Sequence, residues 1–239
     1  MLQCHYYSRS YGEMESLDLY AKIEPMIGFY EAYDKLYRNY LRLLEAYRPE
    51  TVLDVGCGNG RLLQKLQEAG YRASGIDISP KMVEIACKKG VDARCCRLDE
   101  VDVIFDTVLA VADVLNYLDP SQLQPFMEDV ADRLKEDGYF LCDINTWHGF
   151  ADVAAGSMTV DEERGFLAID AEFEEGILQT DFTYFQKREA CYSKEQATIL
   201  QYFHRVDEIV AHSPMRLVGT HDISLFSTES DKTVLVFQK

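Results

Sequence analysis

The sequence has few basic residues for its length. In 239 residues, 24 Lys and Arg stand against 41 Asp and Glu, which gives a formal charge of −17. Proteins that bind nucleic acid mainly through its phosphates need a face rich in Lys and Arg, so this composition argues against such a partner. The surplus carboxylates are most simply explained as a soluble surface. At 47% hydrophobic residues the chain is otherwise ordinary for a globular protein, and it is long enough for one large core or two small ones.

Long apolar runs and paired cysteines are also missing. No uninterrupted apolar run approaches the roughly 20 residues of a membrane span, and residues 1–16 contain no apolar signal core. The seven cysteines are an odd number without a CxxC pair, which indicates neither a disulfide framework nor a zinc site. The adjacent Cys95 and Cys96 form either a redox device or, as we expect, two buried thiols on one strand. These absences predict a cytoplasmic protein with reduced thiols, no metal and no membrane attachment.

What the sequence does contain, from residue 26 onward, is a regular order of helical and strand patterns. Tyrosines recur at helical spacings over residues 26–47, and Pro49 ends that helix. Strands at 51–55, 71–77, 91–96, 105–112 and 139–145 are then expected among helices at 61–69, 80–89 and 121–136. Ser79 is a plausible N-cap for the second of these helices. The alternation predicts a parallel sheet with helices on both faces and ligands at the carboxyl ends of its strands.

After residue 150 the apolar pattern changes to a period of two. Residues 166–173 and 177–186 alternate around a turn at 174–176, which predicts an antiparallel hairpin, and 196–203 add a third strand. A short helix at 204–212 and closing strands at 215–226 and 233–238 follow. Because no repeat or linker separates these parts, we expect one domain with a β-rich insertion.

The most informative stretch joins a strand to a helix at Asp54-Val55-Gly56-Cys57-Gly58-Asn59-Gly60. Glycines after a strand allow positive φ and let a ligand approach the backbone closely. In the dinucleotide fingerprint the third glycine falls one position later, where this chain has Arg61. Asp54 would repel a pyrophosphate but suits a ligand with a positive amino group. Asp77 ends the next strand, where an acid can accept hydrogen bonds from ribose hydroxyls.

These residues, with Gly75-Ile76-Asp77-Ile78-Ser79, resemble the first two motifs of the class I S-adenosylmethionine-dependent methyltransferases. The resemblance covers about residues 29–147 in order and spacing, and the strand at 233–238 is similar to the antiparallel seventh strand of that family. It implies an α/β fold with a Rossmann-like seven-stranded sheet, helices on both faces and an antiparallel β-rich insertion. Residues 113–118 and 143–146 show a looser resemblance to a bacterial subgroup of this family. That subgroup acts on small molecules and carries such an insertion after strand five.

The resemblance implies S-adenosyl-L-methionine as the cofactor. Asp54 would bind its ammonium group and Asp77 its ribose hydroxyls. The family often has an acid after strand three for the adenine amino group; here either Asp99 serves one position late or Leu98 replaces the acid. The expected cofactor-binding residues are Tyr33, Asp54, Gly56, Gly58, Asn59, Gly60, Asp77, Ile78, Met82, Leu98, Asp99, Ala112 and Asp113.

Methyl transfer from a sulfonium mainly requires in-line placement of the nucleophile and exclusion of water. A base is needed only for a nucleophile that arrives protonated, and the candidates after strand five are Asp143 and His148. A histidine at such a rim more often faces solvent or caps a turn. Asp113 and Asn116 are equally compatible with a helix cap or a turn. The expected substrate-side residues are Asn116, Tyr117, Trp147 and Arg205.

Two segments flank the predicted core. Nine of the 15 tyrosines lie in the first 47 residues, either as the buried stripe of a helix or, at Tyr33 and Tyr40, as part of a lid over the cofactor. The insertion is expected to form the other wall of the substrate pocket. It carries nine acids between positions 152 and 181, which would favour a cationic substrate if they pointed inward. Strand alternation places Asp170 and Glu172 together on the solvent side, which favours a solvated face.

The sequence therefore predicts one methyltransferase domain with an N-terminal helical lid (1–48), a cofactor-binding core (49–149), a substrate-side insertion (150–205) and closing strands (206–239). We expect transfer of a methyl group to a nitrogen or oxygen of a small molecule, without nucleic-acid or membrane partners. The acidity mildly favours an amine or an amino sugar. The alternatives are an NAD-dependent oxidoreductase, although the third-glycine spacing is missing, and a cofactor-binding module without catalysis.

Overall fold

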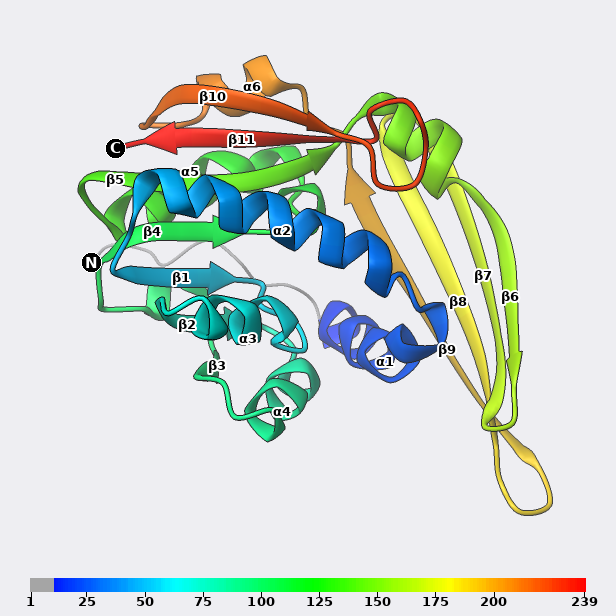
Figure 1. Ribbon diagram of the computed structural model, residues 1–239. Coiled ribbons are helices and arrows are strands. Elements are labelled where there is room, and N and C mark those ends of the chain that lie inside the picture. Colours follow the sequence, from blue (N-terminus) through cyan, green and yellow to red (C-terminus); the bar gives the residue numbers. More distant parts are fainter. Residues whose placement is uncertain (1–10) are drawn as a thin grey trace, which may run out of the picture.

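The predicted α/β fold is confirmed in a computed structural model, which describes residues 11–239 (Figure 1). Seven strands form a mixed sheet, here called sheet A, in the order β10-β11-β5-β4-β1-β2-β3. Strands β1 to β5 run parallel, and β11 lies antiparallel between β5 and β10. The strands are β1 (Thr51–Val55), β2 (Arg72–Asp77), β3 (Ala93–Cys95), β4 (Phe105–Ala110), β5 (Leu134–Asn145), β10 (Arg216–Ile223) and β11 (Lys232–Gln238).

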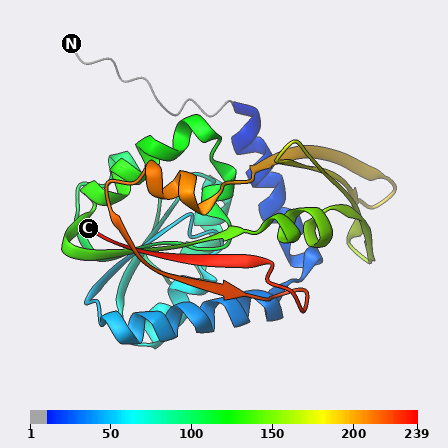
Figure 2. The same cartoon turned by 90° about the horizontal axis from the view of Figure 1, so that it is seen from above.

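Helices cover both faces of sheet A. On one face lie α2 (Tyr30–Tyr47), α3 (Arg61–Glu68) and α4 (Pro80–Lys88), and on the other α5 (Pro120–Asp132) and α6 (Val206–Ala211) (Figure 2). The central strands are therefore apolar on both sides. Val52 packs toward α2 and α3, whereas its neighbour Leu53 packs toward α5, and both are buried. This two-sided burial explains why these strands appear in the sequence as continuous apolar runs.

A second, four-stranded antiparallel sheet, here called sheet B, follows β5 in the chain. It comprises β6 (Gly156–Glu162), β7 (Gly165–Glu174), β8 (Ile177–Lys187) and β9 (Tyr192–Tyr202), and a π-helical turn, η3 (Gly149–Ala154), leads into it. The hairpin turn falls at Glu175-Gly176, both with positive φ, as the sequence predicts. All nine acids between positions 152 and 181 are exposed, so the solvated-face interpretation holds.

The helix α1 (Tyr11–Ile27) joins the two sheets and was not expected from the sequence. Leu19, Ile23 and Met26 of α1 pack on the inner face of sheet B, against residues such as Leu167 and Phe182. Figure 1 shows α1 between sheet B and the open ends of the sheet A strands. The helix predicted at 26–47 is interrupted at Gly28, whose φ of +71° ends α1 before α2 begins.

Three smaller expectations need correction. The predicted helix at 121–136 ends at Asp132, since Leu134 already begins β5. Strand β6 was missed, because it is an edge strand exposed along most of its length and shows no alternation. Cys95 is exposed and Cys96 half-buried, not two buried thiols, because β3 is the edge of sheet A and ends at Cys95. Within residues 11–239, no helix combines the length and apolar character needed to cross a membrane.

Candidate functional site

A cavity of about 490 Å³ opens at the carboxyl ends of β1, β2, β3 and β4, beneath α1. This is the edge at which ligands of parallel α/β sheets bind. Helix α1 contributes three wall residues that the sequence did not reveal, Leu17, Tyr20 and Glu24. The wall includes most of the expected positions, namely Tyr33, Asp54, Gly56, Gly58, Asn59, Asp77, Ile78, Met82, Leu98, Asp99, Ala112, Asp113 and Tyr117.

The glycine loop after β1 curves around one end of this cavity. Gly56 and Cys57 donate backbone hydrogen bonds to the carbonyl of Ile76 at 2.8 and 3.0 Å, which fixes the loop to β2. Gly58 has a φ of +52°, and a Cβ built on it would meet no atom within 4 Å. The loop therefore leaves open space over a backbone that only glycine adopts without strain.

Asp54, at the end of β1, carries a buried carboxyl group without a donor. Asp54 is 2% exposed. In the described part of the chain, no residue donates a hydrogen bond to its carboxylate or forms an ion pair with it. Burial, and then the negative charge of Asp77, raises the pKa of Asp54 to about 8. A buried carboxyl group facing a cavity without a donor is costly unless a ligand supplies one. The site therefore fits a ligand with a cationic group at this point.

Asp77, at the end of β2, organises the backbone on the other side of the cavity. One carboxylate oxygen accepts the Gly58 amide at 2.9 Å and the other accepts the Ser79 amide at 2.8 Å. Ser79 caps α4 as predicted, because its hydroxyl accepts the Met82 amide at 3.2 Å. A carboxylate has further lone pairs, so Asp77 can also accept hydrogen bonds from ligand hydroxyls.

Two polar contacts attach α1 to these same loops. The Ser79 hydroxyl donates to Asp18 at 2.6 Å, and the Asn59 amide nitrogen donates to Glu24 at 3.0 Å. Helix α1 is thus bound to the glycine loop through Glu24 and to the start of α4 through Asp18. It closes the cavity from the side of sheet B.

Tyrosines from three elements gather at the part of the cavity next to Asp113. Tyr20 of α1 and Tyr33 of α2 share a hydrogen bond, and Tyr117 ends the short helix η2 (Val114–Tyr117) nearby. The neighbouring Tyr33 hydroxyl and then burial raise the pKa of Tyr20, while burial and then the charge of Asp113 raise the pKa of Tyr33. Both phenols therefore stay protonated at neutral pH.

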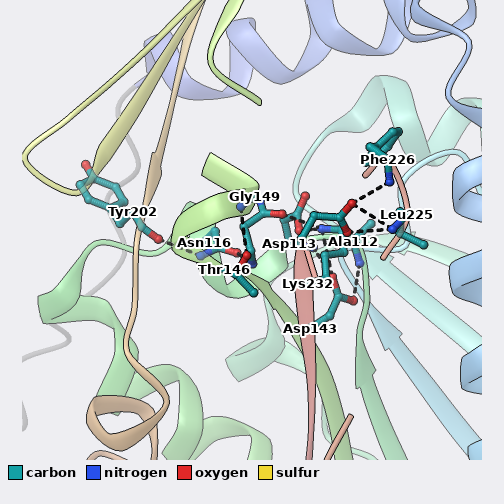
Figure 3. Close-up of polar contacts among 12 residues, drawn as sticks. Ala112, Asp113, Asn116, Asp143, Thr146, Gly149, Tyr202, Leu225, Phe226 and Lys232 are labelled. Atoms are coloured by element: carbon teal, nitrogen blue, oxygen red, sulfur yellow. Dashed lines mark hydrogen bonds and ion pairs between the residues drawn. The ribbon is translucent and has the colours of Figure 1, made fainter. Parts of the chain in front are cut away.

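A buried charge network supports the turn that follows β4 (Figure 3). The Asp143 carboxylate accepts the backbone amides of Ala112 at 2.9 Å and Asp113 at 3.2 Å, as well as the Tyr40 hydroxyl at 2.8 Å. Lys232, at the start of β11, forms ion pairs with Asp113 and Asp143. No local pattern indicated Lys232, because it lies 119 positions from Asp113 along the chain.

The structure places neither candidate base at the cavity wall. Asp143 is fully buried beneath the Ala112-Asp113 turn. His148 lies beyond β5, where its ring nitrogens contact Asp152 and Ser227, each at 3.0 Å. His148 directly precedes η3 and is not among the residues that line the cavity.

Four further expected residues also lie outside the cavity wall. Asn116 is buried and joins β5 to β9, accepting the Asn145 amide and donating to the Tyr202 carbonyl. Trp147 is 55% exposed, and Arg205 is exposed and pairs with Asp207. Gly60 faces α4, where a Cβ would lie 2.9 Å from Ala86 and Val91.

The insertion was expected to form the other wall of the substrate pocket, but it does not line this cavity. No residue between 150 and 205 lines it, because α1 lies between sheet B and the cavity. Sheet B therefore acts on the site indirectly, as the surface on which α1 packs.

Comparisons with known proteins agree with this fold. Residues 52–138 match a family model described as a methyltransferase domain. The Bacillus subtilis protein YqeM, whose name assigns it provisionally as a methyltransferase, is 29% identical over 61% of this chain and 66% of its own length. A demethylmenaquinone methyltransferase of Tropheryma whipplei is 33% identical over 41% of this chain and 42% of its own. The chain thus matches less than two thirds of the length of these curated relatives.

Solved structures extend the similarity in fold to nearly the whole chain. An S-adenosylmethionine-dependent methyltransferase from Clostridium acetobutylicum superposes with a TM-score of 0.74 at 19% identity, covering 86% of this chain and 91% of that one. The sugar N-methyltransferase KedS8 from Streptoalloteichus superposes with a TM-score of 0.72 at 17% identity, covering 100% and 98%. Residues 52–138 thus match a methyltransferase domain, and nearly the whole chain has the fold of these solved methyltransferases.

Proposed function

We propose that this methyltransferase moves a methyl group to a nitrogen or oxygen of a small molecule bound in the cavity beneath α1. The observation that carries the proposal is the carboxyl group of Asp54, which is buried, faces the cavity and has no donor in the described part of the chain. A cofactor that brings an ammonium group and a ribose matches Asp54 and Asp77 together. A pyrophosphate does not, because Asp54 would repel it.

In this proposal the cofactor lies along the walls that the glycine loop and β2 provide. Asp54 binds the ammonium group, Asp77 accepts the ribose hydroxyls, and Asn59 and Tyr33 border the amino-acid part. Ile78 and Met82 contact the adenine, with Leu98 or Asp99 at its edge. When bound, S-adenosylmethionine supplies a methyl group already activated on a sulfonium, so the protein contributes placement and exclusion of water.

We further propose that α1 and α2 act as a lid. Tyr20 and Tyr33 offer neutral phenol groups, and together with Tyr117 they offer aromatic faces, on the closed side of the cavity. This is a suitable environment for a sulfonium. Asp113 lies beside them and can accept a hydrogen bond from an amine or a hydroxyl. An amine is the preferred nucleophile, because the cavity wall carries more carboxylates than basic groups. The similarity in fold to a sugar N-methyltransferase agrees with this choice.

The proposal is tested by methyl transfer with purified protein. We incubate wild type with S-adenosylmethionine and separate panels of small amines, small alcohols and phenols, and ribosomal RNA, and quantify S-adenosylhomocysteine and methylated product by mass spectrometry. Equal amounts of both products from an amine or hydroxyl compound are expected. Asp77→Ala, with its weakened cofactor site, serves as the negative control. Methylation of RNA, with none in either small-molecule panel, would contradict the proposal.

A further inference from the structure

Lys232 is a buried cation placed directly behind the cofactor cavity. It is 3% exposed, and its ammonium group donates to the Asn145 side-chain oxygen at 3.0 Å. The same group pairs with Asp113 and lies 3.5 Å from an oxygen of Asp143 (Figure 3). Lysines are almost never fully buried unless they are paired. Removing the partner of a buried charge is far more costly than removing an exposed pair.

One of the two carboxylates that pair with Lys232, that of Asp143, holds an unusual piece of backbone. Ala112 and Asp113 both have positive φ, +64° and +70°, although neither is glycine. Such conformations are strained for residues other than glycine and persist only where surrounding contacts hold them. Here the contacts are the two backbone amides that donate to Asp143. Both residues of the turn line the cavity.

The charge balance of this network depends on one lysine. Facing Asp113 and Asp143 are Lys232 from β11, Asn145 from β5, Tyr40 and Tyr33 from α2, and Tyr20 from α1. Among these described groups, Lys232 is the one that carries a positive charge. Without it, two buried carboxylates would face each other, and one would take up a proton or move away.

We propose that Lys232 is a positioning residue for methyl transfer: by neutralising Asp113 and Asp143 it fixes the left-handed Ala112-Asp113 turn that forms the cavity wall beside the tyrosines. The inference rests on the proposed function only in taking the cavity as the cofactor site. Lys232 itself touches neither cofactor nor substrate. It acts through Asp113 and Asp143.

The test is the pH dependence of S-adenosylhomocysteine binding, measured by calorimetry between about pH 6 and about pH 9, where carboxylates with raised pKa values titrate. In Lys232→Gln the two carboxylates lose their cation but keep a hydrogen-bond donor. Its affinity relative to wild type is expected to fall by at least about tenfold as the pH rises through this range, because repulsion grows as the second carboxylate ionises. Taking the ratio to wild type at each pH cancels the titration of Asp54 and of the ligand.

Adding Asp113→Asn to Lys232→Gln restores the original net charge of the network. The double variant is expected to fold, and its affinity relative to wild type is expected to stay constant across the pH range, whatever its absolute value. A matched control is Lys239→Gln at the far end of β11, whose ammonium group donates to the carbonyls of Ala131 and Leu134. This variant should lower thermal stability without changing the pH profile.

Two outcomes overturn the inference. One is a pH-independent affinity ratio in Lys232→Gln, which indicates a structural role only. The other is a double variant that does not fold, or whose affinity ratio still falls as the pH rises. The double variant also decides the matter if Lys232→Gln itself does not fold. Failure of the wild type to bind S-adenosylhomocysteine contradicts the proposed function instead, so the two failures are distinguishable.

Discussion

At the scale of single residues, the ionisation of Asp54 is coupled to ligand binding. Its pKa of about 8 in the folded chain lies well above the roughly 3.9 of an unperturbed aspartate. A raised carboxyl pKa means that the folded state holds a proton that the unfolded state has lost. This residue therefore lowers the free energy of unfolding progressively as the pH rises from about 4 to about 8. A bound ammonium group reverses this cost by pairing with the ionised form.

The first prediction is that cofactor binding releases a proton. Near pH 6.5, about one proton should leave Asp54 when S-adenosylhomocysteine binds, and affinity should rise with pH until about pH 8. Titration calorimetry in two buffers with different ionisation enthalpies measures the release. Asp54→Asn, which cannot ionise, should release none and show a flatter pH profile. Binding to wild type without proton release would mean that the ammonium group lies elsewhere.

The second prediction compares two glycines in the same kind of backbone. Gly58 and Gly70 both have positive φ, +52° and +90°, and a Cβ on either would meet no atom within 4 Å. Replacement by alanine should lower the stability of each variant by a similar amount, about 1 kcal/mol. Only Gly58 lines the cavity, so only Gly58→Ala should lose affinity for S-adenosylhomocysteine, by about tenfold or more. Thermal unfolding and calorimetry separate the two effects, and equal affinities in the two variants would place the ligand away from the glycine loop.

At the scale of elements, α1 is the component whose role the sequence did not reveal. It packs on sheet B through Leu19, Ile23 and Met26 and is attached to the cofactor loops through Asp18 and Glu24. A helix that uses one face for sheet B and another for a cavity has no single apolar stripe, which is why its periodicity gave no prediction. Its position makes sheet B the surface that supports α1.

The third prediction concerns the contacts that hold α1 closed. Replacing both Asp18 and Glu24 by alanine removes three hydrogen bonds, those from Ser79 and Lys81 to Asp18 and that from Asn59 to Glu24. Because each contributes about 1 kcal/mol, S-adenosylhomocysteine should dissociate about tenfold faster or more. Rapid filtration with radiolabelled ligand measures the rate. Lys22→Ala is the matched control, because its ion pair with Glu195 is exposed and should contribute little. If S-adenosylhomocysteine leaves the double variant, the control and the wild type at the same rate, α1 is not a lid.

Some elements of the fold could be predicted from the sequence and others could not. Strands such as β1 and β4 were predictable because residues like Val52, Leu53 and Val108 are buried on both faces and form apolar runs. Strand β6 and helix α1 were not, since one is an exposed edge and the other divides its faces between two partners. The cofactor motifs are local in sequence and could be located. The pairing of Asp113 with Lys232 depends on strand order across sheet A, which no local pattern encodes.

At the scale of the whole molecule, the charge of −17 has two separate meanings. The nine acids between positions 152 and 181 are exposed around sheet B and account for solubility, not for a cationic substrate. Asp54, Asp77 and Asp143 are buried at or behind the cavity. Asp77 and Asp143 accept backbone amides that shape its wall, and Asp54 faces the cavity. The acids that matter for chemistry are therefore the few that the fold removes from solvent.

The most direct test of the central claim is a pair of calorimetric titrations, with S-adenosylhomocysteine and with NADH, on wild type and Asp77→Ala. We expect one-to-one binding of S-adenosylhomocysteine to wild type, at least about tenfold weaker binding to the variant through loss of charged hydrogen bonds, and no binding of NADH. Glu172→Ala, on the exposed face of sheet B, should bind as wild type does. Binding of NADH by wild type without any response to S-adenosylhomocysteine would contradict the assignment of the cavity to this cofactor.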